Sequence, residues 1–341
     1  MDWMSRRKPL WRLFFAFMVI VLIATGCGNT QMNIFDPQGS AGEQQLDLLM
    51  ISVYIMLFVF VVVISIYFYV LVRYRRRPGD DTPPKQVEGN TFIEVLWTAI
   101  PVILIVILAI PTVSTTFSLA KEAPEDETVR VKVTAYQYWW MFEYPDLGIR
   151  TSQEMHIPVG KKVFLELEAK DVIHSFWVPN LGGKIDAIPG KTNTMILDAK
   201  KPGMYEGRCA ELCGAGHALM NFRVIAEEQS DFDKWVASIQ KPDSKPVNAL
   251  AEEGKKIFSQ NCVACHAIEG ADFQVKGDKA PDLTGFANRT TIAGYLPNDR
   301  ESLISWLRDP QAFKPGTQMP AYGHLSDQQM NALVDYLTNL K

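Results

Sequence analysis

The chain has 341 residues, 34 Lys plus Arg against 38 Asp plus Glu, and a hydrophobic fraction of 48%. This composition excludes a disordered chain, and it provides no general basic surface for nucleic acid. Almost all long apolar runs fall before residue 121, which excludes a simple cytosolic enzyme. The 5 cysteines are too few for a disulfide scaffold, whereas the length allows two or three domains.

The N-terminal residues 1–26 are typical of a signal peptide. Basic residues at positions 6, 7, 8 and 12 precede the uncharged run 13–23, and small residues then lead to Cys27. The small residue directly before Cys27 resembles a bacterial lipoprotein cleavage site, at which the new N-terminal cysteine is acylated. Plain cleavage and an uncleaved anchor are the alternatives. Residues 27–45 are then expected to form a short extracytoplasmic segment.

Two uncharged stretches within residues 46–120 are each long enough to cross a hydrocarbon core of about 30 Å. We expect transmembrane helices over about 48–72 and 95–119. The connecting loop 73–94 carries five basic residues, so the positive-inside rule puts it in the cytoplasm and both chain ends outside. Glu94 begins the second span, and its position alone indicates an ordinary interfacial acid.

From residue 128 the hydrophobic pattern changes to strict alternation. Val129, Val131 and Val133 alternate with polar residues, and the same period of two recurs further along the chain, with Pro-Gly turns between the segments. This pattern predicts half-buried strands. We therefore expect a small β-sandwich or barrel over residues 121–228.

The last loop of this region carries a candidate metal site: Cys209, Cys213, His217 and Met220. Thiolate, imidazole and thioether donors in this mixture suit copper. Two cysteines outside the cell would otherwise favour a disulfide, but a disulfide needs neither histidine nor methionine.

A second histidine ligand is expected from a loop well before these cysteines. His174 follows a predicted strand and is the best candidate, whereas we expect His156 to be a surface residue. Two thiolates with two imidazoles exceed what one blue-copper ion uses. The economical interpretation is two copper ions bridged by both sulfur atoms.

Residues 229–247 are a predicted linker, and a new domain follows over residues 248–341. Its sequence Cys262-Val-Ala-Cys265-His266 is a c-type haem attachment signature, with His266 as the iron ligand. A thioredoxin-like dithiol is the rival interpretation, but it lacks the βαβ setting. Met319 is the candidate for the sixth ligand and His324 the lesser alternative, while Met330 is expected in the core of a capped terminal helix.

The cysteine loop, the upstream segment 174–179, the loop 184–190 and the segment 94–98 together resemble subunit 2 of haem-copper cytochrome c oxidases over about residues 45–228. The resemblance implies a cupredoxin-like domain and a dinuclear copper centre, CuA. Its implied ligands are Cys209, Cys213, His174, His217, Met220 and the Glu211 carbonyl group. It also implies that the Glu211 carboxylate faces a magnesium site shared with subunit 1, and that Glu94 lies at the mouth of a proton pathway.

The aromatic segment 136–144 resembles the part of that family where electrons are received. The family commonly has tryptophan in place of Tyr138, and that tryptophan contacts an external cytochrome c. Trp139 or Trp140 could make this contact in place of Tyr138. Alternatively, the site of electron entry could differ because the donor is attached to the chain. The plain interpretation is that these rings fill the sandwich core.

The region 248–341 resembles a class I cytochrome c, and a CuA subunit fused to it resembles subunit 2 of caa-type oxidases. The resemblance implies a multi-domain protein of the bacterial cytoplasmic membrane: a two-helix transmembrane hairpin in lipid, a cupredoxin-like β-sandwich and a small all-α cytochrome c domain, both of the latter extracytoplasmic.

The implied function is electron transfer from an external donor, such as a cytochrome c or a quinol:cytochrome c reductase, through haem c and CuA to subunit 1. Oxygen reduction and proton translocation would belong to the complex with subunits 1 and 3, since this chain has no residues for oxygen chemistry. A membrane-anchored haem and copper carrier lipoprotein, or a nitric oxide reductase subunit, is the alternative. A quinol oxidase subunit would lack the copper ligands.

Overall fold

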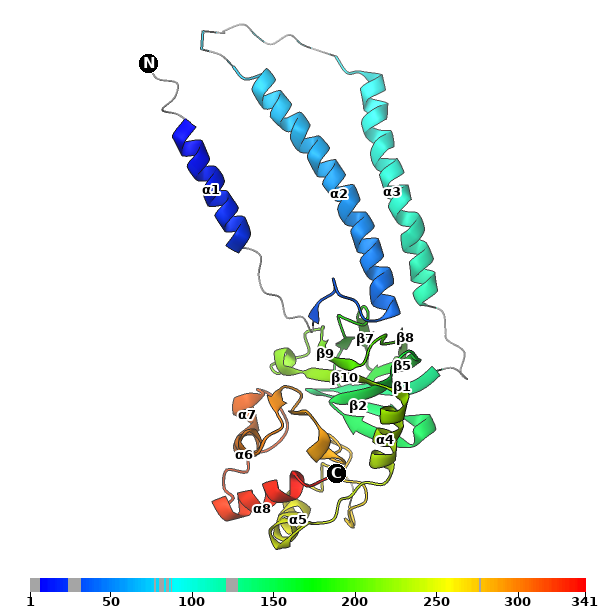
Figure 1. Cartoon of the computed structure of the whole chain (residues 1–341), viewed down its shortest axis with the longest axis vertical. Helices are drawn as coiled ribbons and strands as arrows, with labels where there is room; N and C mark the ends of the chain where they lie inside the picture. The colour runs from blue at the N-terminus through cyan, green and yellow to red at the C-terminus, as the bar shows by residue number, and fades with distance from the viewer. Residues whose placement is uncertain are drawn as a thin grey trace.

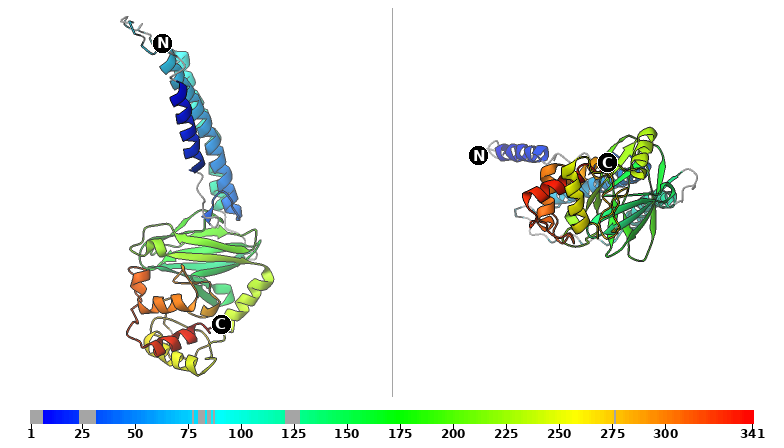
Figure 2. Two further views of the ribbon diagram at one scale, coloured as in Figure 1. Left: turned by 60° about the vertical axis from the view of Figure 1, so that its left-hand side comes forward. Right: turned by 90° about the horizontal axis from the view of Figure 1, so that it is seen from below.

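The structure is a computed structural model, and it describes residues 7–23, 32–76, 78–79, 83, 86, 88–120, 128–275 and 277–341. Cys27, where lipidation is predicted, lies outside the described residues. The described part has three regions in chain order: apolar helices, a two-sheet domain and a mainly helical C-terminal domain (Figures 1 and 2). These regions confirm the predicted fold class.

The N-terminal region contains the helices α1 (Arg7–Ile23), α2 (Ser40–Arg73) and α3 (Thr91–Leu119). Helices α2 and α3 lie side by side, and both are long and apolar enough to cross a membrane (Figure 1). Their large apolar side chains are exposed along both helices, which suits a bilayer rather than water. The Asn90 side chain caps α3 by accepting hydrogen bonds from the backbone N–H groups of Phe92 and Ile93.

The first turn of α2 is fixed to the two-sheet domain. The Ser40 hydroxyl donates to the Asp198 carboxylate at 2.5 Å, and the Gly42 N–H donates to the Leu181 carbonyl at 3.1 Å. A Cβ atom on Gly39 would lie 2.4 Å from that same carbonyl oxygen, so only glycine fits there. The membrane hairpin therefore continues directly into the soluble domain.

The two-sheet domain contains two five-stranded sheets, with strand orders β3-β2-β1-β5-β8 and β4-β10-β9-β6-β7. The pairs β1–β5 and β4–β10 are parallel and the other pairs are antiparallel. The strands are β1 (Thr128–Tyr136), β2 (Trp139–Tyr144), β3 (Ile149–Ser152), β4 (Glu154–Pro158), β5 (Lys162–Ala169), β6 (His174–Trp177), β7 (Ile185–Ala187), β8 (Asn193–Leu197), β9 (Gly203–Cys209) and β10 (Asn221–Glu227), with the short helices η4 (Pro145–Leu147) and η5 (His217–Leu219).

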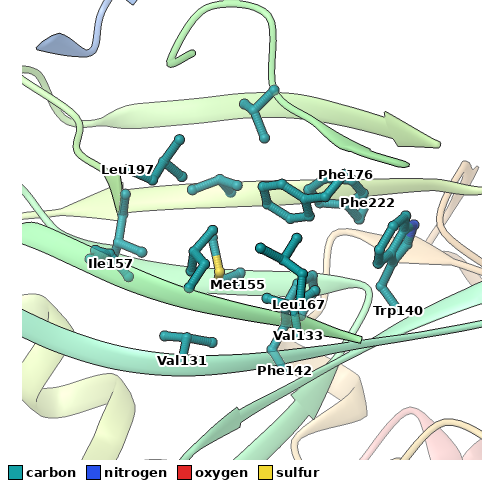
Figure 3. Packing of buried hydrophobic residues seen from close by; sticks show 14 of the residues in the cluster. Val131, Val133, Trp140, Phe142, Met155, Ile157, Leu167, Phe176, Leu197 and Phe222 are labelled. Atoms are coloured by element: carbon teal, nitrogen blue, oxygen red, sulfur yellow. The ribbon is translucent and has the colours of Figure 1, made fainter. Parts of the chain in front are cut away.

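The core of this domain lies between the two sheets. Val131 and Val133 of β1 face Phe176 and Phe222 of the opposite sheet (Figure 3), and the last two rings stack with centroids 4.6 Å apart. Burial alternates along β5 and β10, as the period of two predicts. Tight packing here fixes β6, β9 and β10, whose ends carry the candidate copper ligands.

Helix α4 (Gln229–Gln240) occupies much of the predicted linker and packs against the edge strand β4. His156 of β4 stacks on Trp235 of α4 with centroids 4.2 Å apart, and its Nδ1 lies 3.0 Å from the Glu227 carboxylate. His156 is therefore half-buried, contrary to the surface position expected for it. The reason is that α4 covers this strand, which the sequence around His156 does not reveal.

The C-terminal domain packs α5 against α8 around an apolar core. Asn248 caps α5, the predicted capping box of Ser326 and Gln329 begins α8, and Met330 is buried as expected. Its elements are α5 (Ala249–Asn261), η6 (Phe286–Asn288), β11 (Thr291–Ile292), β12 (Leu296–Pro297), α6 (Arg300–Arg308), α7 (Pro310–Phe313) and α8 (Asp327–Leu337).

The C-terminal domain is docked on the two-sheet domain beside β3 and β4. Arg150 Nε lies 2.7 Å from the Asp282 carboxylate, which is buried. The buried Glu154 carboxylate accepts from the backbone N–H groups of Thr290 at 2.7 Å and Thr291 at 3.2 Å. Buried carboxylates with such partners indicate a defined interface rather than a loose tether.

Candidate copper and haem sites

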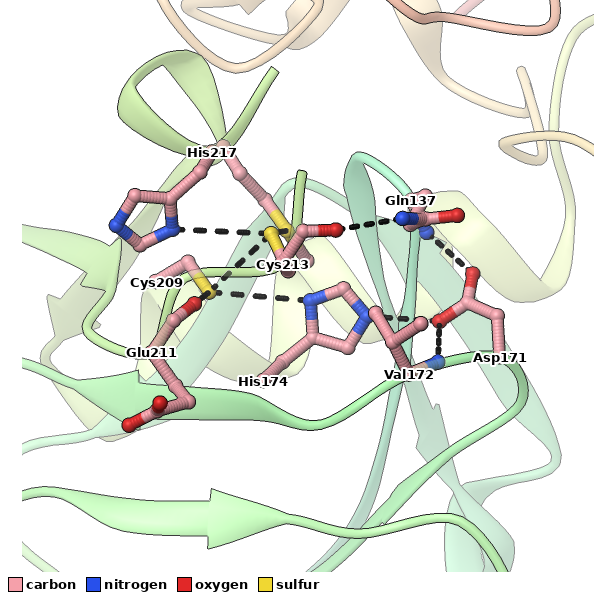
Figure 4. A network of polar contacts seen from close by, with 9 residues as sticks. Gln137, Asp171, Val172, His174, Cys209, Glu211, Cys213 and His217 are labelled. Carbon is pink, nitrogen blue, oxygen red and sulfur yellow. Dashed lines mark hydrogen bonds and ion pairs between the residues drawn. The ribbon is translucent and has the colours of Figure 1, made fainter. Parts of the chain in front are cut away.

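The copper loop, which we define as residues 209–220, connects β9 to β10 at one end of the sandwich. The Sγ atoms of Cys209 and Cys213 lie 3.9 Å apart. His174 Nδ1 lies 3.8 Å from the first sulfur, and His217 Nδ1 lies 3.7 Å from the second (Figure 4). Met220 Sδ is 3.8 Å from Cys213 Sγ. All the predicted side-chain ligands therefore meet at one place.

Strand pairing explains how a distant histidine reaches the copper loop. Phe176 of β6 pairs with Cys209 of β9, which brings His174, two residues earlier, beside the loop. The Ala210 N–H also donates to the Ser175 carbonyl at 2.9 Å. The sheet register therefore places His174 beside the copper loop.

Asp171 holds the His174 ring in place. Its carboxylate lies 2.8 Å from His174 Nε2 and accepts from the backbone N–H groups of Gln137 and Val172 at 2.6 and 2.7 Å. Burial alone would raise the pKa of Asp171, but these three hydrogen bonds lower it. The bond at Nε2 directs Nδ1 toward Cys209, as second-sphere carboxylates do for metal-binding histidines.

The two thiols shift each other's pKa in opposite directions. Their mutual hydrogen bond lowers the pKa of Cys209 and raises that of Cys213, since one sulfur is stabilised as a thiolate at the other's expense. Their separation of 3.9 Å is about twice a disulfide bond length of roughly 2.05 Å. Two nearby sulfurs flanked by imidazole nitrogens and a thioether fit a pair of copper ions.

The haem-attachment residues follow the end of α5. Cys262 is buried, which raises its pKa to about 12, and Cys265 is exposed. His266 Nδ1 lies 2.7 Å from the Pro281 carbonyl oxygen, so Nε2 is the nitrogen left for iron. Burial also lowers the pKa of His266 and favours the neutral, metal-binding form. These residues fit a covalent c-type haem.

Met319 lies on the Met319 loop, which we define as residues 314–320. Its side chain is half-buried against the core of the C-terminal domain. His324, the lesser alternative, is exposed, with its ring 6.0 Å from the Tyr322 ring. The two candidates for the sixth ligand thus differ in burial: Met319 packs against the domain core and His324 is exposed.

Comparisons with known proteins agree with this geometry. Three family models match: "Cytochrome C oxidase subunit II, transmembrane domain" over residues 28–115, "Cytochrome C oxidase subunit II, periplasmic domain" over 147–227, and "Cytochrome c" over 251–341. Cytochrome c oxidase subunit 2 of Alkalihalophilus pseudofirmus is 46% identical over 97% of this chain and 98% of that protein. The chain belongs to the cytochrome c oxidase subunit 2 family.

Further relatives bear the same or a related name. Cytochrome c oxidase subunit 2 of Bacillus sp. strain PS3 is also 46% identical, over 97% of this chain and 98% of that protein. Quinol oxidase subunit 2 of Bacillus subtilis is 38% identical, over 68% of this chain and 73% of that protein. Membership in the oxidase subunit 2 family makes this chain a component of an oxidoreductase complex that binds copper and haem c.

The aromatic segment 136–144 is buried or half-buried along its whole length. Tyr138 is 6% exposed, Trp139 is 8% exposed and stacks on Tyr136, and Trp140 is wholly buried against Phe176. The Trp140 ring thus belongs to the sandwich core.

Tyr138 is in contact with both metal-binding regions. A Cβ atom added to Gly216 of the copper loop would lie 2.5 Å from the Tyr138 ring. One added to Gly316 of the Met319 loop would lie 3.0 Å from its hydroxyl oxygen. Because both glycines lack a side chain, the Tyr138 ring fits between the two loops.

The acidic residues named by the family resemblance lie at exposed positions. In Figure 4 the Glu211 carbonyl oxygen faces Cys209 Sγ at 3.3 Å, whereas the carboxylate points away from the sulfur atoms. Glu94 lies in the first turn of α3 and is exposed.

Sequence reasoning misses several residues of the site. The position of Asp171 three residues before His174 is a local clue, whereas Gln137, in the turn between β1 and β2, donates to the Cys213 carbonyl at 2.5 Å without any such clue. Lys314 is buried between the domains, and burial lowers its pKa to about 7. The Gln137 contact depends on the fold of the sandwich and the burial of Lys314 on the domain interface, and no local pattern encodes either.

Proposed function

We propose that this chain receives electrons for a caa-type cytochrome c oxidase and delivers them to its oxygen-reducing subunit. Electrons would pass from an external donor, such as a cytochrome c or a quinol:cytochrome c reductase, through haem c and then CuA to the haem and copper centres of subunit 1. When bound, both groups supply reversible one-electron transfer. The residues of this chain hold and orient them.

The copper ligand set proposed here is Cys209, Cys213, His174, His217, Met220 and the carbonyl of Glu211. Mutual distances of 3.3 to 3.9 Å along this set support two ions bridged by both thiolates. Asp171 and the β6–β9 pairing fix the ligand His174 in advance, so little rearrangement should accompany a change of charge.

The haem-binding residues proposed here are Cys262 and Cys265 for covalent attachment, with His266 and Met319 on the iron. The Pro281 carbonyl selects the ring nitrogen of His266 that faces the iron. A thioether as sixth ligand favours a high reduction potential, which suits a donor to copper.

The observation that carries the proposal is the contact of Tyr138 with both loops. The copper loop and the Met319 loop approach this one ring from opposite domains. The covered position of Tyr138, Trp139 and Trp140 favours a donor attached to the same chain over an external cytochrome c at this surface. The external donor would then act on the cytochrome domain.

The partner proposed for the copper end is subunit 1, with subunit 3 completing the complex. Leu212 of the copper loop is 79% exposed, and Val172 and Ile173 beside His174 are also exposed. Apolar side chains at such positions suit burial by another protein. The outward Glu211 carboxylate supports a shared magnesium site there, and Glu94 is proposed as an acid at the start of a proton pathway.

We further propose removal of residues 1–26 and acylation of Cys27, which would place the mature chain as a lipoprotein in the bacterial cytoplasmic membrane. Two membrane-spanning helices already fit a two-pass protein whose sheet domain is periplasmic. Mass spectrometry of the mature N-terminus tests the lipid, since plain cleavage would leave an unmodified cysteine.

The test of the proposed function is purification of the full chain with its partners from membranes. We expect two coppers and one c-type haem iron per chain, a mixed-valence copper signal in electron paramagnetic resonance, and a large haem-bearing subunit that consumes oxygen. Haem without paired copper, or a complex that reduces nitric oxide but not oxygen, would refute the proposal. Isolation as a lone chain would instead favour an electron carrier.

A further inference from the structure

Lys314 begins the Met319 loop and lies buried between the two soluble domains. It is 2% exposed, and its Nζ donates to the Tyr138 carbonyl at 3.0 Å and to the Ala293 carbonyl. Among the described residues no carboxylate forms an ion pair with it. Burying an amino group at such a position costs desolvation free energy, which its hydrogen bonds to the two backbone carbonyls offset only in part, so its position calls for an explanation.

The two carbonyl groups belong to different domains. Tyr138 precedes β2 of the sandwich, whereas Ala293 lies in the turn between β11 and β12 of the cytochrome domain. Lys314 itself follows α7, so one side chain connects three segments that are far apart in sequence. The Tyr138 segment and the Met319 loop both pack against the copper loop, and the Ala293 turn packs against Asn221, which directly follows it.

The backbones pack tightly at this junction. A Cβ atom on Gly294, next to Ala293, would lie 2.3 Å from the carbonyl oxygen of Asn221, which follows the copper ligand Met220. A Cβ atom on Gly316, two residues after Lys314, would lie 3.0 Å from the Tyr138 hydroxyl oxygen. Both glycines have positive φ, at 87° and 81°. Two turns of the cytochrome domain, at Gly294 and Gly316, thus pack closely against the end of the sandwich that carries the copper loop. Lys314 connects these two turns through its bond to the Ala293 carbonyl.

We propose that Lys314 is a positioning residue whose buried amino group ties the Ala293 turn and the Met319 loop to Tyr138, and so sets the approach between the cytochrome domain and the copper loop. The inference rests on the proposed electron transfer. Lys314 is not one of the residues proposed to hold copper or haem, and it acts by holding the two loops on opposite sides of the Tyr138 ring. Only an electron crosses this junction, so no bond forms or breaks there.

The test compares Lys314→Met with the wild-type chain in the purified complex. Methionine keeps an apolar stem of similar length but cannot donate to the carbonyls. Lys256→Met, in α5 and exposed, is the matched control. We expect transfer from photoreduced haem c to copper to slow roughly tenfold to a hundredfold, as for small misplacements of reacting groups. The haem potential and the mixed-valence copper signal should not change.

A second readout does not depend on turnover. Backbone hydrogen exchange in Lys314→Met should accelerate in segments 136–142, 290–297 and 314–320, while α5 and α8 keep wild-type protection. Unchanged transfer with unchanged exchange would overturn the inference, because Lys314 would then be a passive buried side chain. Faster exchange throughout the cytochrome domain would overturn it too, because the role would be in folding. No transfer in the wild-type complex would instead refute the proposed function and remove the basis of this inference.

Discussion

The copper site and the haem site position their histidines in opposite ways. At the copper site His174 presents Nδ1 to the ligand cluster, because the Asp171 carboxylate holds Nε2 at 2.8 Å. At the haem site His266 leaves Nε2 for iron, because the Pro281 carbonyl oxygen holds Nδ1 at 2.7 Å. A carboxylate makes the ring a stronger donor than a neutral carbonyl does. The candidate copper ligand His174 is therefore held by a charged carboxylate, whereas the candidate haem ligand His266 is held by a neutral carbonyl group.

The two sites also differ in how the chain assembles them. The candidate copper ligands come from β6 and from a loop 35 residues later, which the sheet brings together. Both cysteines and the histidine of the haem site lie within five residues, 262–266, after α5. The copper site thus needs the folded sandwich, whereas haem attachment needs mainly a local segment. Changes at one site should leave the other intact.

The largest expected effect comes from Cys213→Ser. Serine cannot bridge copper as a thiolate, so the paired site should be lost and the mixed-valence signal should disappear. Haem attachment at Cys262 and Cys265 should remain complete. Metal analysis with haem staining measures both at once, and a loss of haem in parallel with copper would contradict the independence of the two sites.

Met319→Ala should change the haem site alone. The haem stays attached, but its reduction potential falls by on the order of a hundred millivolts, since axial ligands move haem potentials over about 0.8 V. Transfer to copper becomes slower or less favourable. Spectroelectrochemical titration measures the potential, with Met330→Leu in the buried core as the control. An unchanged potential would exclude Met319 as the sixth ligand.

Asp171→Asn tests whether the negative charge of the Asp171 carboxylate, next to His174 Nε2, raises the affinity for copper. Asparagine has the same shape but no charge, so copper affinity should fall roughly 10- to 100-fold, as for other second-sphere changes. Asp146→Asn at an exposed position is the matched control. Competition with a copper chelator gives the affinity, and equal affinity in both variants would mean that only the geometry at Nε2 matters.

Arg150→Met is expected to have the smallest effect. Loss of its bond to Asp282 should weaken domain docking by about 1 kcal/mol, because the arginine is partly exposed and Thr284 still donates to the carboxylate. Backbone N–H groups at this interface, such as those of Thr290 and Thr291, should then exchange about fivefold faster. Arg300→Met, whose partner Asn331 lies within the cytochrome domain, serves as the control. If the same N–H groups also exchange faster in the control, the effect would be a general loss of stability and not a specific weakening of domain docking.

The structural features that could be predicted from the sequence are those that depend on residues close together in the chain. The alternation in β1 and β5, the capping box of α8 and the haem motif are local patterns, and the structure contains those elements. His174 required a fold-level argument because strand pairing, not spacing, brings it to the cysteines.

The contacts between domains could not be predicted in this way. Glu154, Asp282 and Lys314 are polar residues that a local pattern assigns to the surface, and they are buried only because the two domains meet there. His156 differs from its expected surface position for a related reason, since α4 packs back onto β4 and covers its ring. Burial of this kind follows from tertiary packing rather than from propensity or period.

The joint between α2 and the sandwich has a mechanical consequence. Leu181, whose carbonyl oxygen accepts from Gly42 in the first turn of α2, follows His174 by only seven residues, and Gly39 allows no gap at this point. These contacts tie the first turn of α2 to the domain that carries the copper loop. We therefore expect the depth of α2 in the lipid to determine the height of the copper loop above the membrane, and with it the alignment of this chain with a partner subunit.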